Sequence, residues 1–259
     1  MSIILNKLID QLYNYKKDLI KFKTQKVVIG IRYTAVLLNT GDLGLSYTLT
    51  NRIEDQKGYS ILFKSEEPSK TPLIHLINYC TSEYSILRSI GVAAMNAYCQ
   101  HYIQNSYDTK NDIRQFLNTD IKIKTGMVGN IKPISSFLTH CGCTVKILDK
   151  SSKKSNKSLL TFVDSYLDLL NVDQLIISGS ALTHNNFDEI MRILRTVKGL
   201  KVFLGPSAQI LPSFASQLGF SFLGSVKSRN PARILDIIMQ GGGFQQFKHL
   251  TAKYLIPLT

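Results

Sequence analysis

The feature that most limits the fold of this chain is a unit repeated five times in its second half: a short strand-like run, a small loop and a helical pattern. The runs expected to form strands are Ile121–Thr125, Thr144–Leu148, Gln174–Ile177, Lys201–Leu204 and Phe220–Leu223. A helical pattern follows each of them. The first, third and fourth patterns end at Leu138, at Leu194 and at about Leu218, the second lies around Leu159–Leu170 and the fifth covers about Pro231–Met239. This alternation predicts a parallel sheet with right-handed crossovers, as in a Rossmann-like domain.

Four of the five strand-to-helix loops are rich in Gly and Ser. They are Gly126-Met127-Val128-Gly129, Ser178-Gly179-Ser180, Gly205-Pro206-Ser207 and Gly224-Ser225. Such loops leave the sheet at its carboxyl edge, where ligands bind. Glycine allows backbone N–H groups to approach a ligand, and each following helix points its positive end there. The loops predict a phosphate or carboxylate site, although they are also compatible with tight turns alone.

A dinucleotide is the less favoured ligand for these loops. The first loop lacks the G-x-G-x-x-G pattern of that site. Asp149 does stand at the end of the second strand, about where an acidic residue would bind a ribose. A single acid at a strand end is more often a simple cap, so we do not base the ligand on it.

The first half of the chain has a different order of elements. A helical pattern in the first 26 residues precedes strands at Val27–Ile31, Tyr33–Leu38 and Leu43–Leu49, with a turn at Asn39–Asp42 and a helix at Tyr84–Tyr102. Small residues in that helix allow close packing. The polar segment Asn105–Asp112 marks the expected boundary, giving a small α+β domain over residues 1–110 and the Rossmann-like domain over 111–259.

The composition indicates a cytoplasmic protein. No apolar run approaches the ~18 residues that a membrane span needs, so no membrane partner is expected. Four cysteines in 259 residues do not make a disulfide framework and fit a reducing compartment.

The formal net charge of +13 raises a second function, the binding of a polyanion such as nucleic acid. The lysines cluster in the first helical pattern and in a polar loop at Lys150–Lys157. No aromatic residues interleave the loop cluster, as a nucleic-acid platform would need. A well-solvated basic surface is therefore favoured over a nucleic-acid partner.

Short motifs in both halves are similar to those of one family. In the first half they are Arg32–Val36, Gly44–Thr48 and Ser89–Ala97, which look like DUF4213. In the second half they are Gly126–Gly129, Ser178–Ser180, Gly205–Ala208, Leu223–Val226 and Gly241–Gly243 with Phe247, which look like DUF364. Their order and spacing together resemble the DUF364/DUF4213 family over nearly the whole chain.

The resemblance implies an N-terminal domain like that of enolase, a Rossmann-like C-terminal domain and a site between them. It also implies heavy-metal chelation, with a suggested link to anaerobic cobalamin biosynthesis. At several cleft positions this sequence departs from the family pattern. Where an aromatic-Pro pair is usual, Asn130, Ile131 and Lys132 precede Pro133. Ala181 stands in place of the usual Thr, His184 in place of Asn and Gln209 in place of Pro, and an Asp usual near Ser228 is missing.

The expected ligand is an anionic small molecule or a metal complex held between the halves. The residues expected to bind it are Arg32, Tyr33, Thr34, Asn96, Gly129, Asn130, Gly179, Ser180, Gly205, Pro206, Ser207 and Gly242. Arg32 is expected to face the loops at Gly179 and Gly205, because an arginine suits an anion held by the opposite domain. No Ser-His-Asp order, H-E-x-x-H or P-loop is present, so the sequence leaves an enzymatic activity open. A homodimer also stays open.

His184 is the candidate ligand for a divalent transition metal, because it stands in a cleft loop and imidazole binds such ions. Helix capping by its neighbours is the alternative. The cluster His140-Cys141-Gly142-Cys143 is poor zinc spacing; we expect Gly142 to end a helix at the amino edge of the sheet. Lys132 and Lys227 could bind an anion or form a Schiff base, but surface lysines are commoner.

Overall fold

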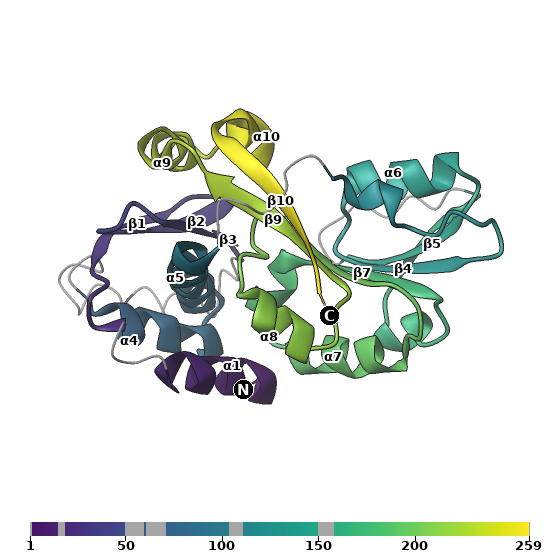
Figure 1. Ribbon diagram of the computed structural model, residues 1–259, viewed down its shortest axis with the longest axis horizontal. Helices are drawn as coiled ribbons and strands as arrows, with labels where there is room; N and C mark the ends of the chain where they lie inside the picture. The colour runs from purple at the N-terminus through teal and green to yellow at the C-terminus, as the bar shows by residue number, and fades with distance from the viewer. Residues whose placement is uncertain are drawn as a thin grey trace.

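The computed structural model describes residues 2–14, 19–49, 60, 71–103, 111–149 and 158–258. The described residues up to 103 form the N-terminal half and those from 111 onward form the C-terminal half, each built on one sheet (Figure 1). The residues 105–110 of the predicted boundary and the basic loop 150–157 lie outside the described residues, so the division near residue 110 stays a prediction.

The N-terminal half contains a three-stranded antiparallel sheet of β1 (Thr24–Ile29), β2 (Tyr33–Leu38) and β3 (Leu43–Tyr47). The predicted turn joins β2 to β3, with Gly41 at a positive φ of 85° and its N–H donating to the carbonyl of Leu38 at 2.9 Å. The small α+β architecture predicted for this half is confirmed.

Helix α5 (Ser85–Tyr102) covers one face of this sheet and is buried from Ser85 to Gln100. Its small residues allow the close contact with the sheet that the sequence predicts. A Cβ added to Gly44 of β3 would lie 2.0 Å from the carbonyl oxygen of Ala93. The described residues of this half also form two shorter helices, α1 (Ile3–Asn14) and α4 (Leu73–Asn78).

The C-terminal half contains a seven-stranded sheet in the order β10-β9-β8-β7-β4-β5-β6. Its strands are β4 (Lys124–Val128), β5 (Thr144–Leu148), β6 (Leu160–Val163), β7 (Gln174–Ser178), β8 (Lys201–Leu204), β9 (Phe222–Ser228) and β10 (Thr251–Pro257). Neighbouring strands are parallel, except that β10 runs antiparallel to β9. The first six strands have the Rossmann order 3-2-1-4-5-6, whose direction reverses between β4 and β7.

Helices cover both faces of this sheet, with α6 (Lys132–His140) on one side and α7 (Phe187–Thr196) and α8 (Pro212–Gln217) on the other (Figure 1). Helix α9 (Pro231–Met239) and the short α10 (Phe244–Phe247) lie instead against the N-terminal sheet (Figure 1). Ile234 and Ile238 of α9 share a buried cluster with Val28 and Ala35. The N-terminal sheet is therefore enclosed between α5 and a helix of the other half.

Three predictions for the C-terminal half are wrong in detail. The segment predicted as a helix over 159–170 forms strand β6 followed by a 3-10 turn at Tyr166–Leu169. Gly224 and Ser225 lie inside strand β9 rather than in a loop, so three of the four predicted Gly/Ser loops stand at the carboxyl edge. The first of these is shorter than predicted, because Gly126–Val128 belong to β4 and only Gly129 follows the strand. Helix α8 begins only at Pro212, after an irregular segment from Gly205. Strand β10 was not predicted.

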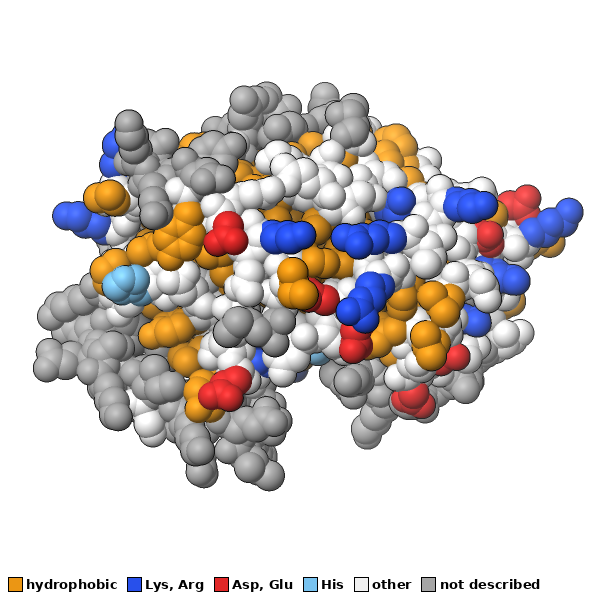
Figure 2. Space-filling model, turned by 90° about the horizontal axis from the view of Figure 1, so that it is seen from below, with side chains coloured by type: hydrophobic (Ala, Val, Ile, Leu, Met, Phe, Trp, Pro, Cys, Tyr) orange, Lys and Arg blue, Asp and Glu red, His pale blue; other side chains and the backbone are white. Residues whose placement is uncertain are grey.

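Buried side chains join the two halves. The largest buried cluster combines residues of α1 and α5 with residues of α7 and α8, such as Leu5, Met95, Phe187 and Phe214. None of the described helices is long and apolar enough to cross a membrane. On the face in Figure 2, Lys and Arg side chains are interspersed with Asp and Glu. The choice between a solvated basic surface and a polyanion-binding surface stays a prediction.

Candidate functional site

A cavity of about 400 Å³ lies where the Rossmann strand order reverses, and both halves contribute to its wall. The C-terminal half supplies the loops after β4, β5, β7 and β8, and the N-terminal half supplies β2 and β3. The lining residues are Tyr33, Tyr47, Leu49, Val128, Gly129, Asn130, Leu148, Asp149, Tyr166, Ser178, Ser180, Ala181, His184, Ile190, Pro206 and Ser207. Sheets of this order bind ligands at this crevice, so the location matches the prediction from the loops.

The loop after β4 is fixed by its own hydrogen bonds. Gly129 has a φ of 79°, which favours glycine, and an added Cβ would lie 2.8 Å from the Cβ of Ser178. The N–H of Asn130 donates to a carboxylate oxygen of Asp149 at 2.9 Å, and the hydroxyl of Ser135 donates to the Asn130 side chain at 3.1 Å. Asp149 and Asn130 are thereby held together on the cavity wall.

The loops after β7 and β8 touch through their backbones. A Cβ on Gly179 would lie 2.2 Å from the backbone nitrogen of Ala208, so only glycine fits there. Gly205 has a φ of 121°. The hydroxyl of Ser180 lies 3.0 Å from that of Ser178, and both residues line the cavity. The two loops together place the hydroxyl-bearing residues Ser178, Ser180 and Ser207 on the cavity wall.

Three tyrosines line the cavity. Tyr33 and Tyr47 pair across β2 and β3, with ring centroids 6.2 Å apart and planes nearly perpendicular. Burial, followed by the nearby Tyr47, raises the pKa of Tyr33 well above its usual range. Burial, with a smaller contribution from the Glu189 carboxylate, raises the pKa of Tyr166 to about 12. The phenols of Tyr33 and Tyr166 are therefore neutral at physiological pH and can donate a hydrogen bond.

Polar side chains of the C-terminal half bind the N–H groups along one edge of β3, next to the cavity. The N–H of Tyr47 donates to the hydroxyl of Ser207 at 2.9 Å, and the N–H of Leu45 donates to the side-chain oxygen of Gln209 at 2.7 Å. The amide of Gln209 donates in turn to the carbonyl of Val226 at 2.9 Å. The C-terminal half thus satisfies a strand edge of the N-terminal half.

The structure brings about half of the predicted site residues together. Tyr33, Gly129, Asn130, Ser180, Pro206 and Ser207 line the cavity, together with the candidate metal ligand His184. Gly179 and Gly205 shape the adjoining loops without lining it. Asn96 is fully buried in α5, where its amide donates to the carbonyls of Leu45 at 2.7 Å and Ser207 at 2.8 Å. These two hydrogen bonds hold β3 and the Ser207 loop, which both contribute to the cavity wall.

Arg32, Thr34 and Gly242 lie outside the cavity. Arg32 is exposed, and its Cδ lies 3.0 Å from where a Cβ on Gly243 would stand, so it does not face Gly179 and Gly205 as expected. The hydroxyl of Thr34 is buried and lies 2.9 Å from that of Thr48. The N–H of Gly242 donates to the carbonyl of Ile237 at the end of α9. Strand alternation explains Thr34, whose side chain points to the opposite face of β2 from that of Tyr33. Arg32 lies in the bend before β2, and Gly242 follows the end of α9.

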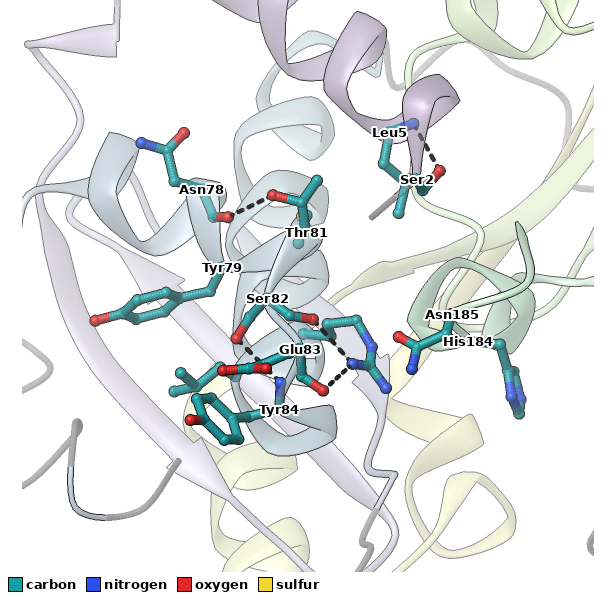
Figure 3. A pocket seen from close by; sticks show the side chains of 13 residues that line it. Ser2, Leu5, Asn78, Tyr79, Thr81, Ser82, Glu83, Tyr84, His184 and Asn185 are labelled. Atoms are coloured by element: carbon teal, nitrogen blue, oxygen red, sulfur yellow. Dashed lines mark hydrogen bonds between the residues drawn. The ribbon is translucent and has the colours of Figure 1, made fainter. Parts of the chain in front are cut away.

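His184 stands on the wall between the cavity and a second one of about 640 Å³. Figure 3 shows the imidazole pointing away from Ser82 and Glu83, while the Asn185 side chain points toward them. The buried Arg88 holds this segment, because its Nε donates to the carbonyl of Thr183 at 2.9 Å. Arg88 also donates to the carbonyls of Ser82 and Glu83, so α5 positions the loop that carries His184.

Within the described part of the chain, no three His, Cys, Asp or Glu side chains gather to hold a metal ion. The cluster at His140–Cys143 ends α6 as expected. Gly142 has a φ of 85°, its N–H donates to Thr139, and the N–H of Cys143 donates to Leu138, which is a Schellman motif. Lys227 donates to the carbonyl of Ile103 at the end of α5 at 3.0 Å, a contact between the halves.

Sequence reasoning missed several cavity residues, notably Tyr47, Tyr166 and Ile190. Tyr47 could have been found, because its spacing from Tyr33 across the predicted turn makes the two cross-strand partners. Tyr166 could not, since the helix predicted there hid the loop after β6. Asp149, for which a simple strand-end cap is the favoured interpretation, also lines the cavity.

The fold and the cavity define the class: a two-sheet α/β protein with a Rossmann-like half and a ligand-sized cavity at its carboxyl edge. A family model described as "Putative heavy-metal chelation", DUF364, matches residues 112–257. A second model with the same description, DUF4213, matches residues 14–99. The chain belongs to the DUF364/DUF4213 family.

Relatives of the chain cover nearly its whole length. The uncharacterized protein MJ0500 of Methanocaldococcus jannaschii is 26% identical over 241 residues, which span 92% of this chain and 91% of that protein. A DUF364 protein of unknown function from Pyrococcus horikoshii superposes with a TM-score of 0.74 at 28% identity, covering 94% of this chain and 98% of its own. One from Desulfitobacterium hafniense DCB-2 gives 0.71 at 16% identity, covering 96% and 98%.

Proposed function

We propose that this protein binds a small molecule or a metal complex in the cavity between its two halves. The observation that carries the proposal is the position of the cavity, which lies at the reversal of strand order and has walls from both sheets. Its volume and its mixture of aromatic, aliphatic and hydroxyl groups suit a small organic ligand.

The family description favours a ligand that carries a metal. His184 supplies one donor to the cavity, and no three metal-binding side chains gather in the described part of the chain. A single imidazole suits a metal that already has other ligands better than a bare ion. A metal complex is therefore the form of chelation that this site supports, and a step linked to anaerobic cobalamin metabolism belongs to the same proposal.

An anionic ligand is a separate part of the proposal. An anion would meet the hydroxyls of Ser178, Ser180 and Ser207, but it would also meet the carboxylate of Asp149. No Lys or Arg is among the described residues that line the cavity. Among the described residues, backbone and hydroxyl groups would have to hold the anion.

The test compares a blocked cavity with an open one. Ser180→Trp places a large side chain in the cavity, and Ser213→Trp adds the same side chain on the exposed surface of α8. Calorimetry with inorganic phosphate and with nickel nitrilotriacetate probes the anion and the metal complex separately. We expect the nickel complex to bind the wild type and the Ser213 variant but not the Ser180 variant.

The role of His184 is tested with the same complex. Loss of a metal ligand should weaken binding by about tenfold or more, so His184→Ala should show this loss while free nickel and free chelator bind little. Equal affinity for wild type and His184→Ala would reject His184 as a ligand. Equal binding to the Ser180 and Ser213 variants, for both probes, would show that neither probe uses the cavity.

A further inference from the structure

The two cysteines Cys141 and Cys143 stand where α6 ends and β5 begins, at the edge of the sheet opposite to the cavity. We infer that their thiols form a chelating site for a divalent thiophilic metal ion, of which Hg(II) is the simplest example. This site is separate from the cavity between the halves, so the inference goes beyond the proposed function and does not depend on it.

Helical spacing turns the side chain of Cys141 toward the sheet. Cys141 follows the buried residues Ile134 and Leu138 of α6 by seven and three positions, which places it on the same face of the helix. It is half-buried and packs against the hydrophobic cluster that contains both of these residues. Its side chain is therefore directed into the layer between α6 and the sheet.

Strand alternation turns the side chain of Cys143 into the same layer. Cys143 and Val145 are buried in the cluster that Cys141 contacts, while Thr144 between them is exposed. Burial raises the pKa of the Cys143 thiol most, and the Cys141 thiol raises it further, as neighbouring thiols do. The two thiols therefore converge on one end of this layer, one from the helix and one from the strand.

Gly142 makes the tight turn that brings the helix and the strand together. Its φ of 85° lies in the left-handed region that favours glycine. The N–H of Cys141 donates to the carbonyl of Phe137 at 3.1 Å, and the N–H of Cys143 donates to that of Leu138 at 3.0 Å. Because these hydrogen bonds fix the backbone of both cysteines, little ordering is needed when an ion binds.

The number of donors decides which kind of metal suits the site. A structural zinc ion takes four protein ligands, but no three metal-binding side chains gather among the residues that the structure describes. Cys80 and Cys99, the other two cysteines of the chain, are buried in a different cluster. Thiolates are soft ligands, and Hg(II) is a soft ion that binds two of them in a line. Two thiols therefore favour such an ion over zinc.

The position of the pair also favours a divalent ion over a monovalent one. Each thiol loses its proton to the solvent when the metal–sulfur bonds form, so Hg(II) gives a neutral complex, whereas Cu(I) would leave a negative charge. The pair lies at the C-terminal end of α6, where the helix dipole disfavours negative charge, and burial adds to this cost. Binding replaces only a weak contact of 3.8 Å from the Cys143 sulfur to the carbonyl of Asp120.

The experiment adds Hg(II) to the full chain in excess glutathione and weighs the folded protein by native mass spectrometry. Glutathione has one thiol, so it removes mercury from a single cysteine far more readily than from two thiols held together in one chain. We expect the wild type to gain one mercury and to lose two protons, and Zn(II) to be lost under the same conditions. Cys141→Ser should weaken the retention of mercury by about tenfold or more, because even outer-shell partners of a metal contribute about 10–100-fold.

Two further variants separate convergence from the number of thiols. Cys80→Ala removes a thiol of the other cluster and should retain mercury as the wild type does. The double variant Cys143→Ala, Thr144→Cys keeps the number of thiols but moves one to the exposed face of β5, so it should lose about tenfold or more in affinity. Melting curves establish that each variant is folded in the assay.

Three results would overturn the inference. They are loss of mercury from the wild type to glutathione, retention by Cys141→Ser at the wild-type affinity, and equal retention by the double variant. Cys141 is half-buried, so Cys141→Ser should fold even where the change at the buried Cys143 disturbs the core. The nickel complex tests the cavity separately, so either site can fail without the other.

Discussion

The side-chain amide nitrogen of Asn96 lies 2.8 Å from the backbone carbonyl oxygen of Ser207. Asn96 is on the buried helix α5 of the N-terminal half, and Ser207 is on the cavity loop of the C-terminal half. The hydroxyl of Ser207 also accepts the N–H of Tyr47, a second cavity residue. The wall of the cavity is therefore built from contacts that cross between the halves.

Replacing Asn96 with alanine should destabilise the protein. The change leaves the carbonyls of Leu45 and Ser207 without this donor in a fully buried position. Each unsatisfied buried group costs about 1–3 kcal/mol, so we expect the free energy of unfolding to fall by at least the lower figure. Urea denaturation measures it, with the exposed Asn171→Ala as the control. Equal midpoints for the two variants would contradict the bridging role of Asn96.

Gln209→Leu should loosen strand β3 in particular. Leucine has a similar size but cannot accept from the N–H of Leu45 or donate to the carbonyl of Val226. We expect the unfolding free energy to fall by about 2 kcal/mol or more, because two buried backbone groups lose their partner. Hydrogen exchange should be faster at the Leu45 amide than in the wild type. Unchanged exchange there, with β7 as the internal reference, would argue against this contact.

Asp188 should make stability depend on acid pH. Its carboxylate accepts from the Ser2 hydroxyl and from the N–H groups of Ile3 at 2.7 Å and Ile4 at 3.2 Å, at the start of α1. Burial raises the pKa of Asp188, but these hydrogen bonds outweigh it and hold the pKa below the ordinary 3.8. A lowered folded-state pKa means that the contribution is present above 3.8 and is lost as the pH falls through the folded value.

Asp188→Asn tests this dependence. At pH 7 the variant should be less stable by about 0.5–2 kcal/mol, the range for losing a helix N-terminal cap. The difference between wild type and variant should shrink as the pH falls below about 4, because protonation removes the same charge from the wild type. Unfolding curves at neutral and progressively more acidic pH follow it, with Asp236→Asn as the control. A difference that stays constant with pH would rule out the carboxylate charge as its cause.

Gly179→Ala should disturb the loops that shape the cavity. The new Cβ would lie 2.2 Å from the backbone nitrogen of Ala208, so two backbones must separate. We expect a loss of about 1–3 kcal/mol or more and weaker ligand binding. Gly126→Ala is the matched control, since its Cβ would meet side-chain atoms of Leu175 and Val172 at 3.0 Å, which can move. Similar melting temperatures for the two variants would contradict the tight backbone contact.

The sequence predicted the fold where local pattern and tertiary pairing agree. Strands over 33–38, 144–148 and 201–204 and the helix over 231–239 have the bounds that were expected. It failed at β6, where apolar spacing over 159–170 looks helical. The capping box of Ser165 and Asp168 starts a separate 3-10 turn there, and Leu160–Val163 pairs with β5 instead. Tertiary pairing decided the structure of this segment.

The sequence predicts the loops of the candidate site better than the side chains that line it. The glycines at 129, 179 and 205 were found because turns and close contacts require them. Gly224 was wrongly predicted to lie in a loop. It lies within β9, where an added Cβ would stand 2.4 Å from a side-chain atom of Leu204. Arg32 was expected in the cleft because of its charge, but only the pleat of β2 decides that Tyr33 faces the cavity. Charge alone does not carry that information.

The hydrogen bonds of α5 and β3 with the C-terminal half have a consequence for the kinetics of ligand entry. Opening the cavity by a hinge would break the buried contacts of Asn96 and Gln209 together. We therefore expect a ligand to enter a site that is already formed, without a slow separation of the two halves. The observed rate in a stopped-flow mixing experiment should rise in proportion to ligand concentration, without the plateau that a gated site produces.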